Sequence, residues 1–169
     1  MNKHEVLEAR TTFFNEVVDA LLIPPTETDL FLNQDKYYIK PVQNKIIKHA
    51  EFGDLIIPIE GKFFSTKFTV NYSLWQLGKN LKISISITNI DLQGAFVADK
   101  NDEISELWGE HHIPQIDISR GFIFYTWTFD TENLFSDYLE KEKFIFGIRH
   151  MHFRAMKIIH DECSRLKNK

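Results

Sequence analysis

The segment LKISISIT, residues 81–88, alternates strictly between apolar and polar side chains. Side chains two residues apart share one face of an extended chain, so this segment has one apolar face and one polar face. A strand with that pattern is typical of an antiparallel sheet whose core lies on one side. The apolar series then shifts to even positions at Ile90 and Leu92. The shift reverses the two faces and predicts a strand end or a bulge at Asn89.

Further strand patterns lie on both sides of this segment. Residues 37–41 and 44–61 suit short strands separated by turns. Residues 62–72 alternate as one half-buried strand, whose inward face would carry Phe64, Thr66, Phe68, Val70 and Tyr72. Residues 121–129, GFIFYTWTF, have large apolar side chains on both faces, which predicts a central strand covered on both sides. Together these patterns predict a central antiparallel sheet of about five or six strands.

Two helical patterns precede the last strand. Residues 3–22 carry an apolar stripe at helical spacing, and the pair Pro24-Pro25 would end that helix. A short helix is expected near 102–109, where Gly109 would end it.

The C-terminal part of the chain is also predicted to be helical. No proline follows Pro114, and either Asp130 or Thr131 could cap a helical region that runs to about Leu166. Its apolar face would pack on the sheet. The sequence therefore predicts an α+β fold in a single domain that spans residues 1–169.

Residues 149–160, RHMHFRAMKIIH, hold three of the seven histidines of the chain. Successive residues of a helix turn by about 100°, so His150 and His152 would face opposite sides and could not bind one metal ion together. The apolar residues of this segment fall on one face of a helix, with His152 at its centre and His150 on the polar face. We therefore expect a solvated His150, a buried and hydrogen-bonded His152, and no metal site.

Other chemical signatures are weak. His112 and Asp117 are expected to be solvated loop residues, because their spacing matches no metal signature. Cys163 is the one cysteine and falls on the apolar helix face, which favours an inert core thiol. The sequence contains neither a glycine-rich phosphate loop nor a G-x-S-x-G nucleophile motif. We expect no catalytic residue, no metal ion and no cofactor.

The charge balance argues against nucleic acid as the main partner. The formal net charge is -4 and no dense basic block is present, whereas affinity for phosphates comes from clustered Lys and Arg. The one candidate basic patch comprises Arg149, Arg154, Lys157 and Arg165. The N-terminal residues are charged, and no run approaches the ~18 apolar residues of a membrane span. We expect a soluble, cytoplasmic protein with no membrane partner.

In outline, the order of elements resembles two known architectures, although no matching residues carry over. One is a small chaperone-like fold, in which helices flank a twisted antiparallel sheet. It fits the first hypothesis, a non-enzymatic protein-binding protein of the immunity, chaperone or accessory type. The expected contact surface then includes Glu103, Glu106 and Trp108. The partner would be another protein of unknown identity, and a homodimer remains open.

Two alternatives also remain open. The outline also resembles helix-grip proteins, which would imply an apolar small molecule in a cavity between the C-terminal helix and the sheet. The side chains expected to line such a cavity are His152, Met156, Trp127 and Tyr125. The last alternative is a hydrolase, which requires a cleft that brings together His112, Asp117 and His152.

Overall fold

The computed structural model of the protein describes residues 2–22, 37–88, 106–109, 112–119, 122–131, 134 and 137–168. Helix α1 (Lys3–Leu22) precedes the strands and helix α5 (Tyr138–Lys167) follows them. The strands are β1 (Tyr37–Pro41), β2 (Ile47–His49), β3 (Asp54–Phe63), β4 (Thr66–Leu77), β5 (Asn80–Ile87), β6 (Gln115–Ser119) and β7 (Phe122–Asp130). They form one antiparallel sheet in the order β1-β3-β4-β5-β7-β6, and β2 also pairs with β3. The predicted α+β class is confirmed.

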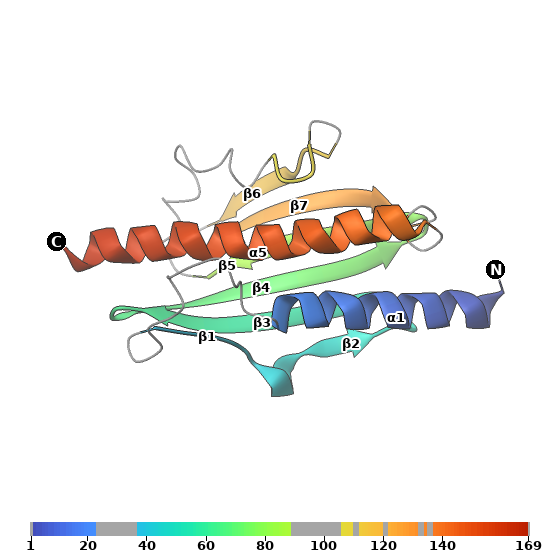
Figure 1. Ribbon diagram of the computed structural model, residues 1–169, viewed down its shortest axis with the longest axis horizontal. Helices are drawn as coiled ribbons and strands as arrows, with labels where there is room; N and C mark the ends of the chain where they lie inside the picture. Colours follow the sequence, from blue (N-terminus) through green and yellow to red (C-terminus); the bar gives the residue numbers. More distant parts are fainter. Residues whose placement is uncertain are drawn as a thin grey trace.

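Both helices lie side by side on the same face of the sheet (Figure 1). They run in the same direction, and both begin near the end of the sheet where β4 turns into β5. Helix α1 has the predicted bounds, and its buried residues Phe13, Phe14, Val17 and Leu21 recur at helical spacing. That spacing gives α1 one apolar stripe, which it buries against the sheet and α5.

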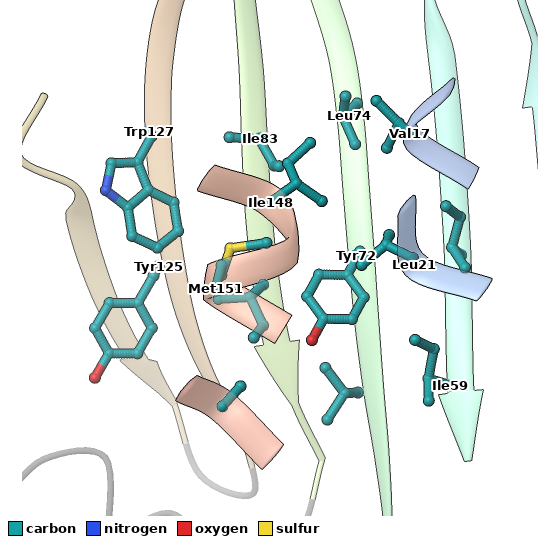
Figure 2. Packing of buried hydrophobic residues seen from close by; sticks show 14 of the residues in the cluster. Val17, Leu21, Ile59, Tyr72, Leu74, Ile83, Tyr125, Trp127, Ile148 and Met151 are labelled. Carbon is teal, nitrogen blue, oxygen red and sulfur yellow. The ribbon is translucent and has the colours of Figure 1, made fainter. Parts of the chain in front are cut away.

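Every second side chain of the strands points toward the helices. Ile83 on β5 lies opposite Leu74 on β4 and Trp127 on β7, and all three side chains are buried. Figure 2 shows this row, with Tyr72 and Tyr125 in the next row of the same face. Each large apolar side chain contributes about 1.5–3 kcal/mol when it is fully buried. The alternating pattern of the strands therefore determines which face holds the core.

The opposite face of the sheet is polar in its centre. Ser84 on β5 lies opposite Thr126 on β7, and Thr128 beyond it is exposed. At Thr128 the strand β7 is therefore covered on one side only, whereas its apolar sequence predicts cover on both sides. Its two threonines are the side chains that face away from the helices, so only the inward face is apolar there. The side chains of Phe122 and Phe124 lie outside the described residues.

The prediction of one continuous strand over residues 62–72 is wrong. Strand β3 ends and β4 begins on either side of a two-residue turn, Phe64-Ser65. Phe64 has a φ of 57°, a conformation that hairpin turns usually fill with Gly, Asn or Asp. The sequence shows no such turn signal. The ring of Phe64 instead packs beside His160, and the ammonium of Lys167 lies 4.7 Å from its centroid.

One edge of the sheet is broken. Strand β1 pairs with the C-terminal half of β3 and β2 with its N-terminal half, and a short 3-10 helix, η2 (Gln43–Lys45), separates the two. The N–H of Val42 donates to the carbonyl of Pro58 at 2.9 Å. In a strand, the N–H and the carbonyl of the same residue point to the same side. The carbonyl of Pro58 points toward the break between β1 and β2, so the N–H that proline lacks would also point there.

Thr131 and Leu134 are helical, as predicted for the start of the C-terminal region, but the long helix α5 begins only at Tyr138. Its N-cap is Asp137, whose Oδ1 accepts hydrogen bonds from the backbone N–H groups of Leu139 (2.9 Å) and Glu140 (3.4 Å). Asp130, one of the two predicted caps, is instead the last residue of β7. The helix then continues without a break through Gly147.

The segment before β6 is described only in part. Residues 106–108 form a turn in which the N–H of Gly109 donates to the carbonyl of Glu106 at 3.0 Å. Gly109 has a φ of 82°, which suits the predicted end of a helical turn. The rest of the short helix predicted near 102–109 lies outside the described residues.

Candidate interaction surface on helix α5

The inward side of α5 carries His152, as its place in the helical pattern predicted. Only 4% of the residue is exposed. A hydrogen bond of 2.7 Å joins its Nδ1 to the hydroxyl of Tyr72 on β4, and the two rings meet edge to face with centroids 5.4 Å apart. Tyr72 projects from β4 beside α5 (Figure 2). The prediction of a buried, hydrogen-bonded histidine is confirmed.

Burial keeps both members of this pair uncharged at neutral pH. It lowers the pKa of His152 from 6.5 to about 4 and raises the pKa of the Tyr72 hydroxyl well above its usual value. Each polar group satisfies the other inside an apolar core, where an unpaired polar group would cost free energy. The pair therefore connects α5 to the centre of the sheet.

The other side chains predicted to line a ligand cavity lie in the same core. Met156, Tyr125 and Trp127 are fully buried. Burial raises the pKa of Tyr125 to about 12, so its hydroxyl stays protonated. Two hollows of the described part of the chain lie along α1 and the β2–β3 turn, and none of these residues lines them. Ligand binding by these side chains remains a prediction.

The residues of the hydrolase hypothesis lie apart. Asp117 on β6 faces away from the helices, because its register partner on β7 is adjacent to the inward-facing Tyr125. The ring of His112 stacks on Phe129 with centroids 4.6 Å apart, so it is not a fully solvated loop residue. His152 lies beneath α5, on the other side of the sheet from Asp117. Within the described ranges, no group of three or more His, Cys, Asp or Glu side chains could hold a metal ion.

Cys163 lies in the core, as predicted. Burial raises the pKa of its thiol to about 11, while a hydrogen bond with Thr66 acts in the opposite direction. The thiolate is the nucleophilic form of cysteine, and it is scarce at neutral pH when the pKa is this high. The thiol is therefore a packing group.

The residues predicted to contact a partner have different environments. Glu106 is exposed, Trp108 is partly buried, and Glu103 lies outside the described residues. The ring of Trp108 packs inside the protein, with its centroid 5.0 Å from that of Trp127 and 5.8 Å from that of Phe144. Because this indole joins the core, it offers a partner less surface than the sequence suggested.

The outward side of α5 carries a continuous stripe of aromatic and basic residues. We call this surface the outer stripe, and it comprises Phe146, Arg149, His150, Phe153, Arg154 and Lys157. Residues three and four apart lie on one helix face, so their side chains are neighbours. Phe146 is 70% exposed, although it lies in the interior of a long helix. An exposed large aromatic residue in this setting is a candidate contact residue.

Contacts between successive turns hold the outer stripe in place. The ring of Phe146 stacks on that of His150 at an interplanar angle of 21°, with centroids 6.0 Å apart. The Nε of Arg154 donates to Nε2 of His150 at 3.2 Å. Side chains that are already ordered lose less conformational entropy on binding. These contacts therefore restrict the side chains of the outer stripe to an ordered arrangement.

The outer stripe has a positive charge. Arg149 and Lys157 are exposed, and neither forms an ion pair with another residue that the structure describes. Arg165, the last member of the predicted basic patch, instead pairs with Glu162 of the preceding turn. Of the predicted basic patch, only Arg149, Arg154 and Lys157 therefore belong to the outer stripe.

Neither Phe146 nor Tyr72 is among the site residues predicted from the sequence. The signal for Phe146 was its position on the helical wheel, opposite the buried stripe, where an aromatic residue is unexpected. No sequence signal links Tyr72 to His152, because 80 positions separate the two residues.

No protein-family model, curated protein or solved structure matches this chain. None of the helices within the described residues is long and apolar enough to cross a membrane.

Proposed function

We propose that the protein is a non-enzymatic protein that binds another protein, and that the outer stripe of α5 is its contact surface. The observation that carries this proposal is Phe146, an aromatic side chain that is 70% exposed, ordered by His150 and adjacent to Arg149. Aromatic residues and arginine are enriched in protein interfaces, where a few such residues supply most of the binding energy.

The charge of the outer stripe defines the chemistry of its partner. Arg149, Arg154 and Lys157 surround an aromatic side chain, so the complementary surface would combine carboxylates with an apolar contact for Phe146. A nucleic acid fits less well, because phosphate binding requires a larger cluster of cations and the whole chain has a net charge of -4. The partner is therefore an acidic protein surface.

Site-specific photocrosslinking tests the position of this surface. A photoreactive phenylalanine analogue would replace Phe146 in one protein and Leu77, which is 58% exposed in the β4–β5 region, in a control. We expect a discrete crosslinked partner from position 146 and none from position 77. Crosslinking of the same species from both positions, or of no species from position 146, would contradict the proposal.

Variants of the outer stripe test its energetic role. Phe146→Ser removes the aromatic side chain that the partner would bury, and Arg149→Glu reverses a charge, so each should weaken binding of the crosslinked partner by roughly 10-fold or more. Leu77→Ser should leave its affinity unchanged. Equal losses for the Phe146 and Leu77 variants would show that the outer stripe has no specific role.

A further inference from the structure

A second surface lies on the other helix, away from the outer stripe. Two hollows, of about 310 Å³ and about 390 Å³, lie along the N-terminal half of α1, and Leu7 and Glu51 line both of them. The opposite wall consists of β2 and the turn that leads into β3, from Lys48 to Phe52. Because the hollows share these lining residues they are adjacent, and we call the two together the α1 groove.

Arg10 lies in the wall of the α1 groove. Its Nη1 donates to the backbone carbonyls of Ala50 (2.6 Å) and Glu51 (3.4 Å), and these bonds fix the guanidinium beside the β2–β3 turn. Its Nε is buried and has no hydrogen-bond partner among the described residues. No described carboxylate forms an ion pair with Arg10, and burial lowers the pKa of its guanidinium. A partly buried cation without a counter-ion favours an anionic ligand.

The other lining residues combine positive charge with apolar surface. Lys3 and Lys48 are exposed cations, whereas Glu51 is the one acidic side chain of the lining. The floor includes Leu7, and Phe52 stands at the rim with 72% of its surface exposed. A complementary ligand therefore carries a negative charge next to a large apolar group.

We propose that the α1 groove binds a short segment of a partner protein in which an Asp or Glu is adjacent to a large apolar residue. The carboxylate would lie near Arg10 and Lys3, and the apolar side chain would cover Leu7 and Phe52. The volume of each hollow is in the range of pockets that hold small ligands, which suits a few residues of a peptide. This site is separate from the outer stripe, so either can exist without the other.

Selection from a random peptide library displayed on phage tests this proposal with the full chain as bait. We expect enriched peptides that contain Asp or Glu beside Leu, Ile, Phe or Trp. A synthetic peptide of the enriched sequence, followed by fluorescence anisotropy, should bind more weakly as salt is added. No enrichment, or enrichment without an acidic residue, would overturn the proposal.

Charge variants then locate the bound peptide. Lys3→Glu changes an exposed side chain, so the fold stays intact, and it should weaken peptide binding by roughly 10-fold. Lys45→Glu is the matched control, because it changes the net charge equally at an exposed position outside the groove. Equal effects of the two substitutions would overturn the proposal.

Two more variants complete the test. Arg10→Gln should also weaken peptide binding, and circular dichroism would show whether the folded state persists. Phe146→Ser should have no effect on the peptide, because it lies on the outer stripe. Loss of peptide binding in Phe146→Ser, with full binding in Lys3→Glu, would assign the peptide to the outer stripe and overturn the α1 groove as its site.

Discussion

The indole Nε1 of Trp108 occupies the space that a side chain at position 147 would need. A Cβ atom added to Gly147 would lie far inside van der Waals contact with that nitrogen. Glycine in a helix interior costs about 1 kcal/mol relative to alanine. The close approach of Trp108 explains why α5 has a glycine there, since only a residue without a side chain lets the ring lie against the helix.

Gly147→Ala should therefore destabilise the protein, although alanine is the better helix former. We expect a loss of about 1–3 kcal/mol in the free energy of unfolding, because the new methyl group displaces the Trp108 ring. Urea denaturation followed by tryptophan fluorescence measures this change. In a Trp108→Ala background the same substitution should stabilise the protein by about 1 kcal/mol. Stabilisation in both backgrounds would contradict the observed contact.

Tyr72→Phe should reveal the energetic role of the buried hydrogen bond. The substitution keeps the ring but removes the partner of His152 Nδ1, and a buried polar group without a partner costs about 1–3 kcal/mol. A double-mutant cycle with His152→Leu provides the control. Because the two residues share one interaction, the double variant should lose less stability than the sum of the single variants. Additive losses would show that the residues are not coupled.

The free energy of unfolding should decrease as the pH is lowered from about 6.5 to about 4. In the unfolded chain His152 takes up a proton below its ordinary pKa of 6.5, whereas burial holds the pKa in the folded protein at about 4. The contribution of this residue is therefore complete above pH 6.5 and is lost as the pH falls. The slope is about 1.4 kcal/mol per pH unit, which amounts to roughly 3 kcal/mol over the whole window.

Urea denaturation of the wild type and His152→Leu at several pH values checks this prediction. Other groups also titrate in the window, so the informative quantity is the difference between the two slopes. The variant should have the shallower dependence. Parallel curves for the two proteins would mean that His152 takes up its proton equally in the folded and unfolded states.

Asp137→Ala should destabilise the start of α5. The carboxylate accepts hydrogen bonds from two backbone N–H groups of the first turn, and removal of such a cap costs about 1 kcal/mol. Thermal denaturation measures the loss. Asp137→Asn keeps an acceptor oxygen and should retain most of the stability. If alanine and asparagine have equal effects, the side chain of Asp137 is not acting as the cap.

Local patterns predicted the faces of the elements well. The alternation around Ile83 identified the inward side of β5, and the helical wheel placed His152 on the buried side of α5. These predictions succeed because the periods of strands and helices are short, so neighbouring residues carry the information. The confirmed α+β class follows from the same patterns.

Features that depend on distant segments could not be predicted in this way. Phe64 occupies a turn position that usually carries glycine or asparagine. The contact of its ring with His160 of α5 stabilises the turn. The acidic segment that contains Trp108 predicted a contact surface, yet the ring of Trp108 packs against aromatic side chains of β7 and α5. The α1 groove likewise requires two elements that lie about 40 residues apart in the chain, as Arg10 and Ala50 do.

The interruption of the β1–β2 edge by η2 also affects how copies of this protein could assemble. A sheet can extend from molecule to molecule only if each copy has an unbroken strand at both edges. One edge then pairs with the preceding copy and the other edge with the following copy. Here a strand added outside β1 and β2 would find no continuous partner, because η2 separates these two short strands. Among the described strands β6 forms the other edge of the sheet, so a sheet extended from β6 would meet the broken β1–β2 edge of the next copy. The break at η2 therefore works against open-ended growth of the sheet into fibres.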